Sequence, residues 1–117
     1  MKNLILILLL VFGLSSSTIY ARPVLTEAGC SKIAHAVGFI QHYVREGSGL
    51  DDLMPDRSAL PKELEEHLKL LEMMSVSNPK MDPQDHAEAY FEFCLAAGGD
   101  IELMNEYIRR AVNAVSI

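Results

Sequence analysis

The sequence predicts an all-α fold, a small bundle of four main helices with short connections, stapled by one disulfide. Apolar residues recur at steps of three and four in four segments, and no strand pattern, hairpin dipeptide or internal repeat interrupts them. The segment 87–100, AEAYFEFCLAAGGD, carries three aromatic residues and one of the two cysteines, and then reaches two glycines. On a helical period, Tyr90, Phe91, Cys94 and Leu95 share one apolar face.

The first 21 residues predict a secretory signal peptide. A basic start at Lys2 precedes an apolar run of eleven residues, 4–14, and a small or polar region ends at Ala21. A membrane anchor is the alternative, but a helix needs roughly 20 apolar residues to cross a bilayer. We therefore expect cleavage after Ala21, export to the periplasm or out of the cell, and no stable membrane insertion.

The remaining 96 residues, 22–117, are enough for one helical domain. They carry a formal charge of −7, since only Lys2 leaves with the signal and all 16 acidic residues stay. A nucleic acid or an anionic membrane would be repelled by that charge, which argues against both as partners.

The two cysteines, Cys30 and Cys94, predict one structural disulfide. Both lie on apolar stripes, and an exported chain meets an oxidising compartment. Closing a loop of this length would stabilise the fold by about 4 kcal/mol in the entropic model. Two free thiols, or intermolecular bonds in a dimer, are the alternatives that the sequence leaves open.

The first helix is expected from a cap at Thr26 to the glycines at 47 and 49, with Gly38 marking a close approach by another helix. The segment 47–61 is irregular and punctuated by proline, with one short turn near its middle. The second helix is expected to begin near 58–61 with Pro61 in its first turn, and to give way to a loop at 75–79.

The last two helices have clear start signals. Asp82 followed by proline opens the third helix, the glycines at 98 and 99 close it, and Asp100 caps the fourth. Pairs at the i, i+4 spacing, such as Glu65 with Lys69 and Glu106 with Arg110, favour helix on the wet faces.

Two groups of residues indicate a possible partner-binding surface. Methionine adapts to irregular partners, and three methionines bracket the predicted loop at 75–80. The irregular segment 47–61 is long enough to suggest a function, and its apolar residues look exposed. The candidate residues are Leu50, Leu53, Met54, Met73, Met74 and Met81. For the methionines, the alternative is that they fill gaps in the core.

Signals for catalysis, cofactor or metal binding are weak. His35 and His42 are about 10 Å apart along one helix, too far to share an ion, and His67 and His86 fall on different helices. We interpret all four as surface histidines, although Asp85 beside His86 leaves a loose site conceivable. No Gly-x-Ser-x-Gly elbow or phosphate loop is present, so we expect no enzyme, no cofactor and no metal.

The plan is similar to that of several small exported helical proteins with one disulfide: periplasmic acid-stress chaperones, phage-encoded periplasmic inhibitors and the animal secretoglobins. The similarity consists of a signal peptide and two cysteines about 65 positions apart. It transfers no functional residue, and the 23 residues after Cys94 set this chain apart from the secretoglobin plan.

We expect a non-enzymatic exported domain that binds a protein partner, as an inhibitor, a chaperone or an accessory subunit. The alternative is a carrier of a small apolar ligand, with a cavity of roughly 300 Å³ or more. Residues such as Val37, Leu68, Phe91 and Ile108 would line that cavity. We favour the protein-binding hypothesis over the carrier hypothesis, because a domain of 96 residues has little volume for a cavity beside its packed core.

Overall fold

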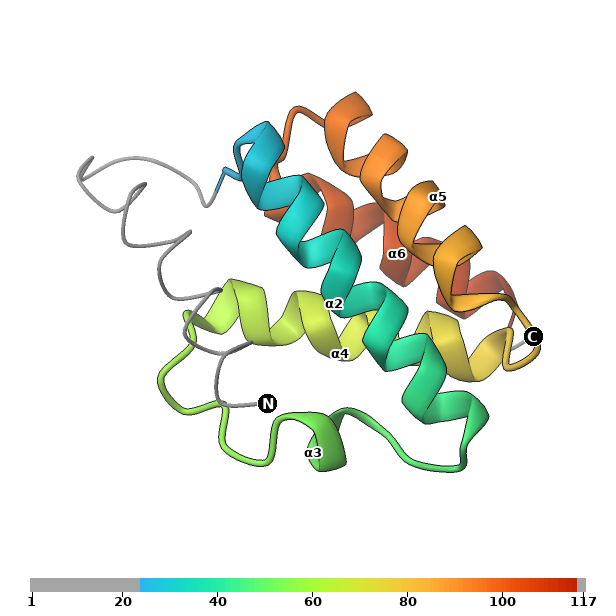
Figure 1. The fold of residues 1–117 in the computed structure, drawn as a ribbon. Coiled ribbons are helices and arrows are strands. Elements are labelled where there is room, and N and C mark those ends of the chain that lie inside the picture. Colours follow the sequence, from blue (N-terminus) through green and yellow to red (C-terminus); the bar gives the residue numbers. More distant parts are fainter. Residues whose placement is uncertain (1–23, 116–117) are drawn as a thin grey trace.

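The computed structural model describes residues 24–115, and the predicted signal peptide, 1–21, lies outside the described residues (Figure 1). The described chain is helical with no strand, so the all-α prediction is confirmed. The helices are α2 (Glu27–Arg45), α3 (Leu50–Leu53), α4 (Lys62–Ser77), α5 (Pro83–Ala96) and α6 (Ile101–Val115).

The four main helices form two crossed pairs. In Figure 1, α5 runs beside α2, while α4 and α6 lie behind that pair at a different angle. α2 also crosses α4, and the short α3 packs below them against both. Consecutive helices are therefore not the ones that pack most closely, since α5 pairs with α2 and α6 pairs with α4.

α2 begins as the sequence predicts. The Thr26 hydroxyl accepts a hydrogen bond from the Gly29 N–H at 3.1 Å and caps the helix. Near its middle, a Cβ added to Gly38 would lie 3.5 Å from the Pro83 carbonyl and 3.6 Å from the Ala87 Cβ. The start of α5 therefore packs beside Gly38, at a distance that would leave an added Cβ in ordinary van der Waals contact.

The irregular segment after α2 does not expose its apolar residues to solvent. Leu50, Leu53 and Met54 are all buried, with exposures of 1%, 3% and 0%. The short helix α3 turns its two leucines and the following Met54 into the core that it shares with α2 and α4. The prediction that these three residues are exposed is wrong, because one helical turn is enough to bury an apolar triplet.

α4 differs from its prediction at both ends. Pro61 is the cap residue rather than part of the first turn, and the helix continues to Ser77 through most of the expected loop. The Asn78 N–H donates to the Met74 and Ser75 carbonyls, each at 3.1 Å, which satisfies two of the final carbonyls. The helix therefore places Ser75 inside the bundle, where its side chain is fully buried.

The turn between α5 and α6 is fixed by glycine. Gly98 and Gly99 both have positive φ, at 66° and 73°. The Leu25 N–H donates to the Gly99 carbonyl at 2.8 Å, so the chain entering α2 is tied to this turn. A Cβ on Gly99 would clash with the Leu25 carbonyl oxygen, so only glycine fits there.

The predicted disulfide is present as an intramolecular bond. Cys30 of α2 and Cys94 of α5 are bonded, with their Cα atoms 5.7 Å apart and a sequence separation of 64. Both cysteines are buried, at 1% and 0% exposure. The bond lies within the α2–α5 pair and joins two helices that already pack along their length.

One core cluster unites the described helices. The buried face of α5 differs from the predicted one. Tyr90 and Cys94 are buried, but Leu95 is 43% exposed, so the apolar face is centred away from Leu95. Phe91 and Phe93 are half-buried on either side.

Among the described residues, no helix has the length and apolar character needed to cross a membrane.

Candidate functional site: an open groove beside a buried polar network

An apolar groove of about 500 Å³ opens between α5 and α6, with the C-terminal half of α4 as its floor. Its two walls carry aromatic and small side chains, and the loop after α4 closes one end. The lining residues are Leu71, Met74, Asn78, Met81, His86, Ala89, Tyr90, Phe93, Tyr107, Ile108 and Ala111.

The groove exists because α5 and α6 separate after the glycine turn. α5 follows α2 and α6 follows α4, so the two helices make little contact with each other. The ring of Phe93 meets the ring of Tyr107 edge-to-face, with centroids 6.4 Å apart. Tyr107 is nevertheless 53% exposed, so the α6 wall presents an aromatic surface to solvent.

The predicted methionine surface is brought together in part. Met74 and Met81 come from opposite sides of the loop after α4, and both line the groove. Met73 is 46% exposed but does not line it. The other three candidates, Leu50, Leu53 and Met54, are core residues and supply no surface.

A buried hydrogen-bonded chain centred on His67 lies beneath the groove. The Nδ1 atom of His67 is 2.6 Å from Oδ1 of Asn105, and its Nε2 atom is 2.6 Å from the Tyr90 hydroxyl. The Asn105 amide nitrogen is 3.3 Å from the Glu63 carbonyl, to which it donates, so its oxygen is an acceptor. His67 therefore carries its proton on Nδ1, and the Tyr90 hydroxyl donates to Nε2.

A second buried group ties α2 to α4 and α5. Nδ1 of His86 is 2.7 Å from Oε1 of Gln41 and 3.4 Å from the Ser75 hydroxyl. The Gln41 amide nitrogen donates to the Asn78 carbonyl at 2.9 Å, so its oxygen accepts from Nδ1–H of His86. Gln41 and Ser75 are both fully buried, and His86 is 7% exposed.

Burial decides the ionisation of these groups. Desolvation lowers the pKa of His67 from 6.5 to about 4, although the hydrogen bond that His67 donates to Asn105 opposes that shift. Desolvation also lowers the pKa of His86, and it raises the pKa of Tyr90 above its ordinary value. Both histidines are therefore neutral near pH 7, which agrees with the donor and acceptor roles above.

The prediction that all four histidines lie on the surface is wrong for His67 and His86. His35 and His42 are exposed as expected. The missed signal was one of position, because His67 falls in the leucine stripe of α4 between Leu64 and Leu68. A polar residue at an apolar position of a helical repeat is most often a buried, hydrogen-bonded one.

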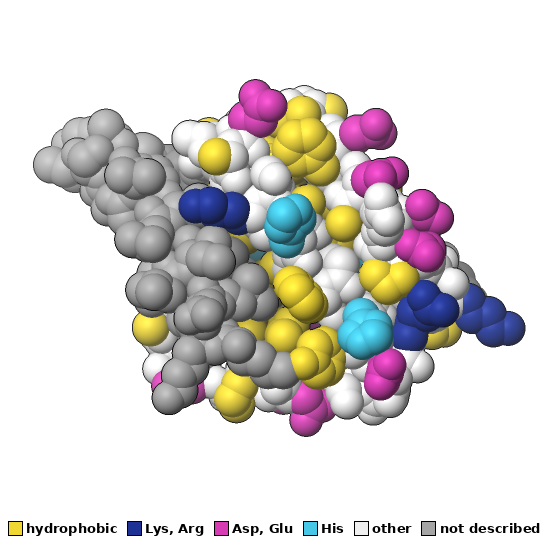
Figure 2. All heavy atoms as spheres, viewed as in Figure 1, with side chains coloured by type: hydrophobic (Ala, Val, Ile, Leu, Met, Phe, Trp, Pro, Cys, Tyr) yellow, Lys and Arg dark blue, Asp and Glu magenta, His cyan; other side chains and the backbone are white. Residues whose placement is uncertain are grey.

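The outer edge of α5 is acidic. Asp85, Glu88 and Glu92 follow one another at helical spacing and are exposed, and Figure 2 shows acidic side chains along this helix. Glu88 accepts a weak hydrogen bond from Gln84 at 3.3 Å, and none of the three pairs with a described lysine or arginine. We call these three residues the acidic crest.

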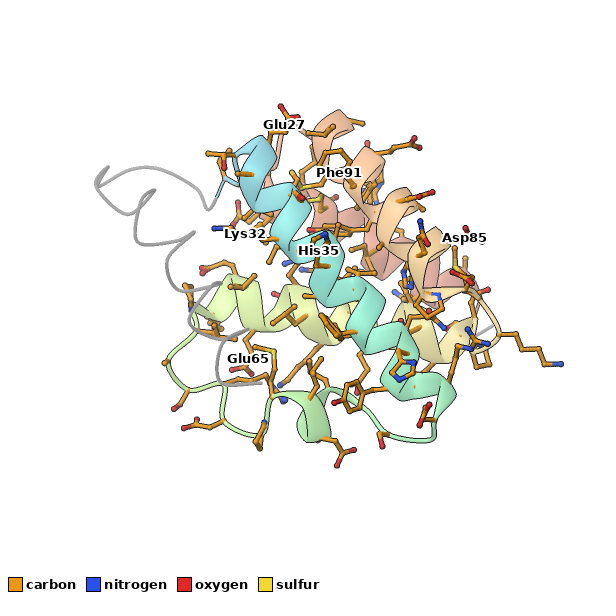
Figure 3. The ribbon with its side chains drawn as sticks, in the orientation of Figure 1. Glu27, Lys32, His35, Glu65, Asp85 and Phe91 are labelled. Carbon is orange, nitrogen blue, oxygen red and sulfur yellow. A yellow bond between two sulfur atoms is a disulfide. The ribbon has the colours of Figure 1, made fainter. Side chains whose placement is uncertain are left out.

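Two further grooves lie on the opposite side of α5, along its seam with α2. One, of about 500 Å³, is lined by Phe91 and by polar residues that include His35 and Glu88. Figure 3 shows Phe91 and His35 at this seam, between the two ribbons. The other, of about 420 Å³ and flatter, lies beside Phe39. Neither contains a candidate partner-binding residue, but Phe91, which was expected to line a ligand cavity, lines the first of them.

We find no protein-family model, curated protein or solved structure that matches this chain. The geometry of the described residues is therefore the basis for any functional argument. Within that part of the chain, no three His, Cys, Asp or Glu side chains are grouped so that they could hold a metal ion.

Proposed function

We propose that this chain is an exported, non-enzymatic helical domain that binds a protein partner, and that the partner binds in the α5–α6 groove. The observation that carries the proposal is the groove lining, in which two methionines meet three aromatic rings. Methionine and aromatic side chains are the residue types that supply adaptable contact area at protein interfaces. The partner would be the target of an inhibitor, the client of a chaperone or the main subunit of a complex.

The chemistry of the site supports binding rather than catalysis. The two cysteines are committed to the disulfide, and His67 is fully buried with both ring nitrogens hydrogen-bonded. Of the buried histidines, only His86 lines the groove, and no nucleophilic side chain stands beside it in the lining. The groove thus offers contact area and one polar ring, which suits recognition.

A carrier of a small apolar ligand is the second candidate, and the groove volume favours it. Ligand sites range from about 300 to 1,000 Å³, so about 500 Å³ is sufficient. The location differs from the expectation, because Val37 and Leu68 are fully buried core residues and only Ile108 of the four expected residues lines the groove. A groove open along its length suits a macromolecule better than a ligand that must be enclosed.

The proposed function is tested with the mature chain, 22–117, carrying an affinity tag. A partner retained from the source's exported fraction is identified, purified and titrated against three proteins: the wild type, Ala89→Glu and Met73→Glu. Ala89 is an exposed residue of the groove wall, and Met73 is an exposed residue outside it. We expect Ala89→Glu to weaken binding at least tenfold and Met73→Glu to leave it unchanged.

Equal binding by all three proteins would show that the partner uses another surface. The carrier is tested separately, by mass measurement of gently purified protein under native conditions. A bound lipid or other apolar molecule that Ala89→Glu displaces would replace the protein partner as the function of the groove.

A further inference from the structure

The two edges of the α5–α6 groove carry different charge. On α5, Asp85 and Glu92 stand one turn before and one turn after Ala89, which lines the groove. The acidic crest does not line this groove itself: Glu88 and Glu92 line the neighbouring groove toward α2, so the crest forms the ridge of α5 between the two grooves. These three carboxylates have no cationic partner among the described residues, and they span about 10 Å along the helix.

The α6 wall is neutralised. Arg110 pairs with Glu106 at 2.7 Å on the same helix, and Arg109 pairs with Glu66 of α4 at 2.7 Å. The exposed residues nearest the groove on this side are apolar, with Tyr107 53% and Leu103 36% exposed. At the end of the groove, Met81 lies between Lys80 and Asp82, whose charges balance. The unbalanced charge at the groove is therefore negative and confined to α5.

We infer that the groove binds an amphipathic, cationic helix of a partner protein, with the apolar face of that helix in the groove and its basic edge along the acidic crest. This inference rests on the proposed function and names the partner's chemistry. An apolar groove between two helices accepts a third helix through anchors at i, i+3, i+4 and i+7. Ala89 and Ala111, one on each wall, leave room for its backbone to approach.

A second copy of this chain fits the groove less well. Each copy would bring its own uncompensated crest and a formal charge of −7 to the interface. Like charges placed together oppose association, whereas basic side chains on a different partner would pair with carboxylates that are otherwise unpaired.

His86 offers one polar contact to an occupant of the groove. The residue is 7% exposed and lines the groove, and its Nδ1 atom is engaged with Gln41. Its Nε2 atom has no hydrogen bond to a described residue, and as the unprotonated nitrogen it is an acceptor. A donor on the partner helix, such as a serine, tyrosine or tryptophan side chain, would satisfy it.

The test uses three synthetic peptides of about 16 residues, each about 24 Å long as a helix. The first has leucine at the anchor positions and lysine along one edge. The second replaces the lysines with glutamate, and the third scrambles the first so that its apolar face is lost. Binding to the mature chain is measured by fluorescence anisotropy at about 20 mM and about 200 mM salt, between which screening rises steeply.

We expect the lysine peptide to bind at least tenfold more tightly than either control peptide, and to weaken with salt. The triple variant Asp85→Asn, Glu88→Gln, Glu92→Gln should bind it about tenfold more weakly and lose most of the salt dependence. A matched variant removes three carboxylates far from the groove: Glu46→Gln, Asp56→Asn and Glu63→Gln. It should bind as the wild type does.

Two results would overturn the inference. In one, the glutamate peptide binds as tightly as the lysine peptide, and Ala89→Glu still blocks it; the groove is then a binding site with no preference for cations, and the proposed function stands. In the other, no peptide binds below about 1 mM, which rejects this partner class while the titration with the retained partner still judges the proposed function.

Discussion

The two seams of α5 are built in opposite ways. Along α2, the helix is held by the Cys30–Cys94 disulfide, and its start packs against Gly38. A buried hydrogen bond from His86 to Gln41 holds it as well. Along α6, it makes one aromatic contact and leaves a groove of about 500 Å³.

The difference shows that neighbours in sequence need not be neighbours in packing. The glycine turn at 98 and 99 lets α6 leave α5 and pack on α4 instead, so the chain covers one side of α5 and leaves the other open. If that is correct, substitutions in the α2–α5 seam will lower stability, and substitutions in the α5–α6 groove will lower binding. Each prediction below tests that division.

The largest effect is expected from the disulfide. Replacing Cys94 with serine should lower the free energy of unfolding by about 2 to 5 kcal/mol, as loss of a native disulfide does in small exported domains. The measurement is urea unfolding of residues 22–117. Tyr107→Ser, in the open α5–α6 seam, is measured beside it and should cost less than about 1 kcal/mol. Mass measurement without reductant should give a monomer about 2 Da lighter than the dithiol. A reduced protein as stable as the oxidised one would contradict the claim that the disulfide stabilises the α2–α5 seam.

Acid should destabilise the fold through the histidines beneath the groove. Because the pKa of His67 is about 4 in the folded state and 6.5 ordinarily, the unfolded chain binds more protons between those values. The stabilisation is complete above about pH 6.5, declines as the pH falls toward 4, and amounts to about 3 kcal/mol. The lowered pKa of His86 acts in the same direction.

The measurement compares unfolding free energies at pH 7 and pH 4.5 for the wild type, His67→Gln and His35→Gln. Glutamine can keep a hydrogen bond to Asn105 but does not titrate, so His67→Gln should lose much of the pH dependence. His35 is exposed, and its variant should behave as the wild type does. An equal loss of stability in all three would place the acid sensitivity elsewhere.

The glycine turn that separates the two seams provides a matched pair of substitutions. Gly99→Ala should cost about 2 to 3 kcal/mol, because positive φ is added to a clash with the Leu25 carbonyl. Gly98→Ala has the same backbone requirement, but no atom lies within 4 Å of its added Cβ, so it should cost about 1 kcal/mol. Thermal unfolding measures both. Equal costs would mean that the link between Leu25 and the turn contributes little.

Much of the fold followed from local signals. Caps at Thr26 and Asp82, proline after the second cap, and glycines at the α5–α6 turn all act within a few residues, so the sequence predicts them well. Pairing of the two cysteines also followed, because only one intramolecular bond is possible between two. The prediction that failed depended on long-range contacts. Whether the segment that holds Leu50, Leu53 and Met54 folds back onto the core is decided by α2 and α4 together.

The candidate site was predicted only in part, for the same reason. Met74 and Met81 were identified because they flank one loop, but the other groove walls come from α5 and α6, whose separation no local pattern reveals. The buried polar network was visible in principle. His67 and Asn105 each stand within an apolar helical repeat, and such positions indicate a hydrogen-bonded core residue.

The smallest effect on stability, and the clearest test of the two seams, is expected in the groove itself. Ala89→Glu adds a charged side chain to an exposed helical position of the wall, and glutamate is a good helix former. We expect the free energy of unfolding to stay within about 0.5 kcal/mol of the wild type, as for most surface substitutions. The added carboxylate would nevertheless obstruct an apolar occupant of the groove, and it would leave the packing of the core unchanged. Ala36→Glu is the opposite control in α2, at a position with 0% exposure, and should cost several kcal/mol because it buries an unpaired carboxylate. Urea unfolding of the two variants decides the question. If Ala89→Glu proves as destabilising as Ala36→Glu, the α5–α6 seam is part of the packed core, and the division between a structural seam and a binding seam is wrong.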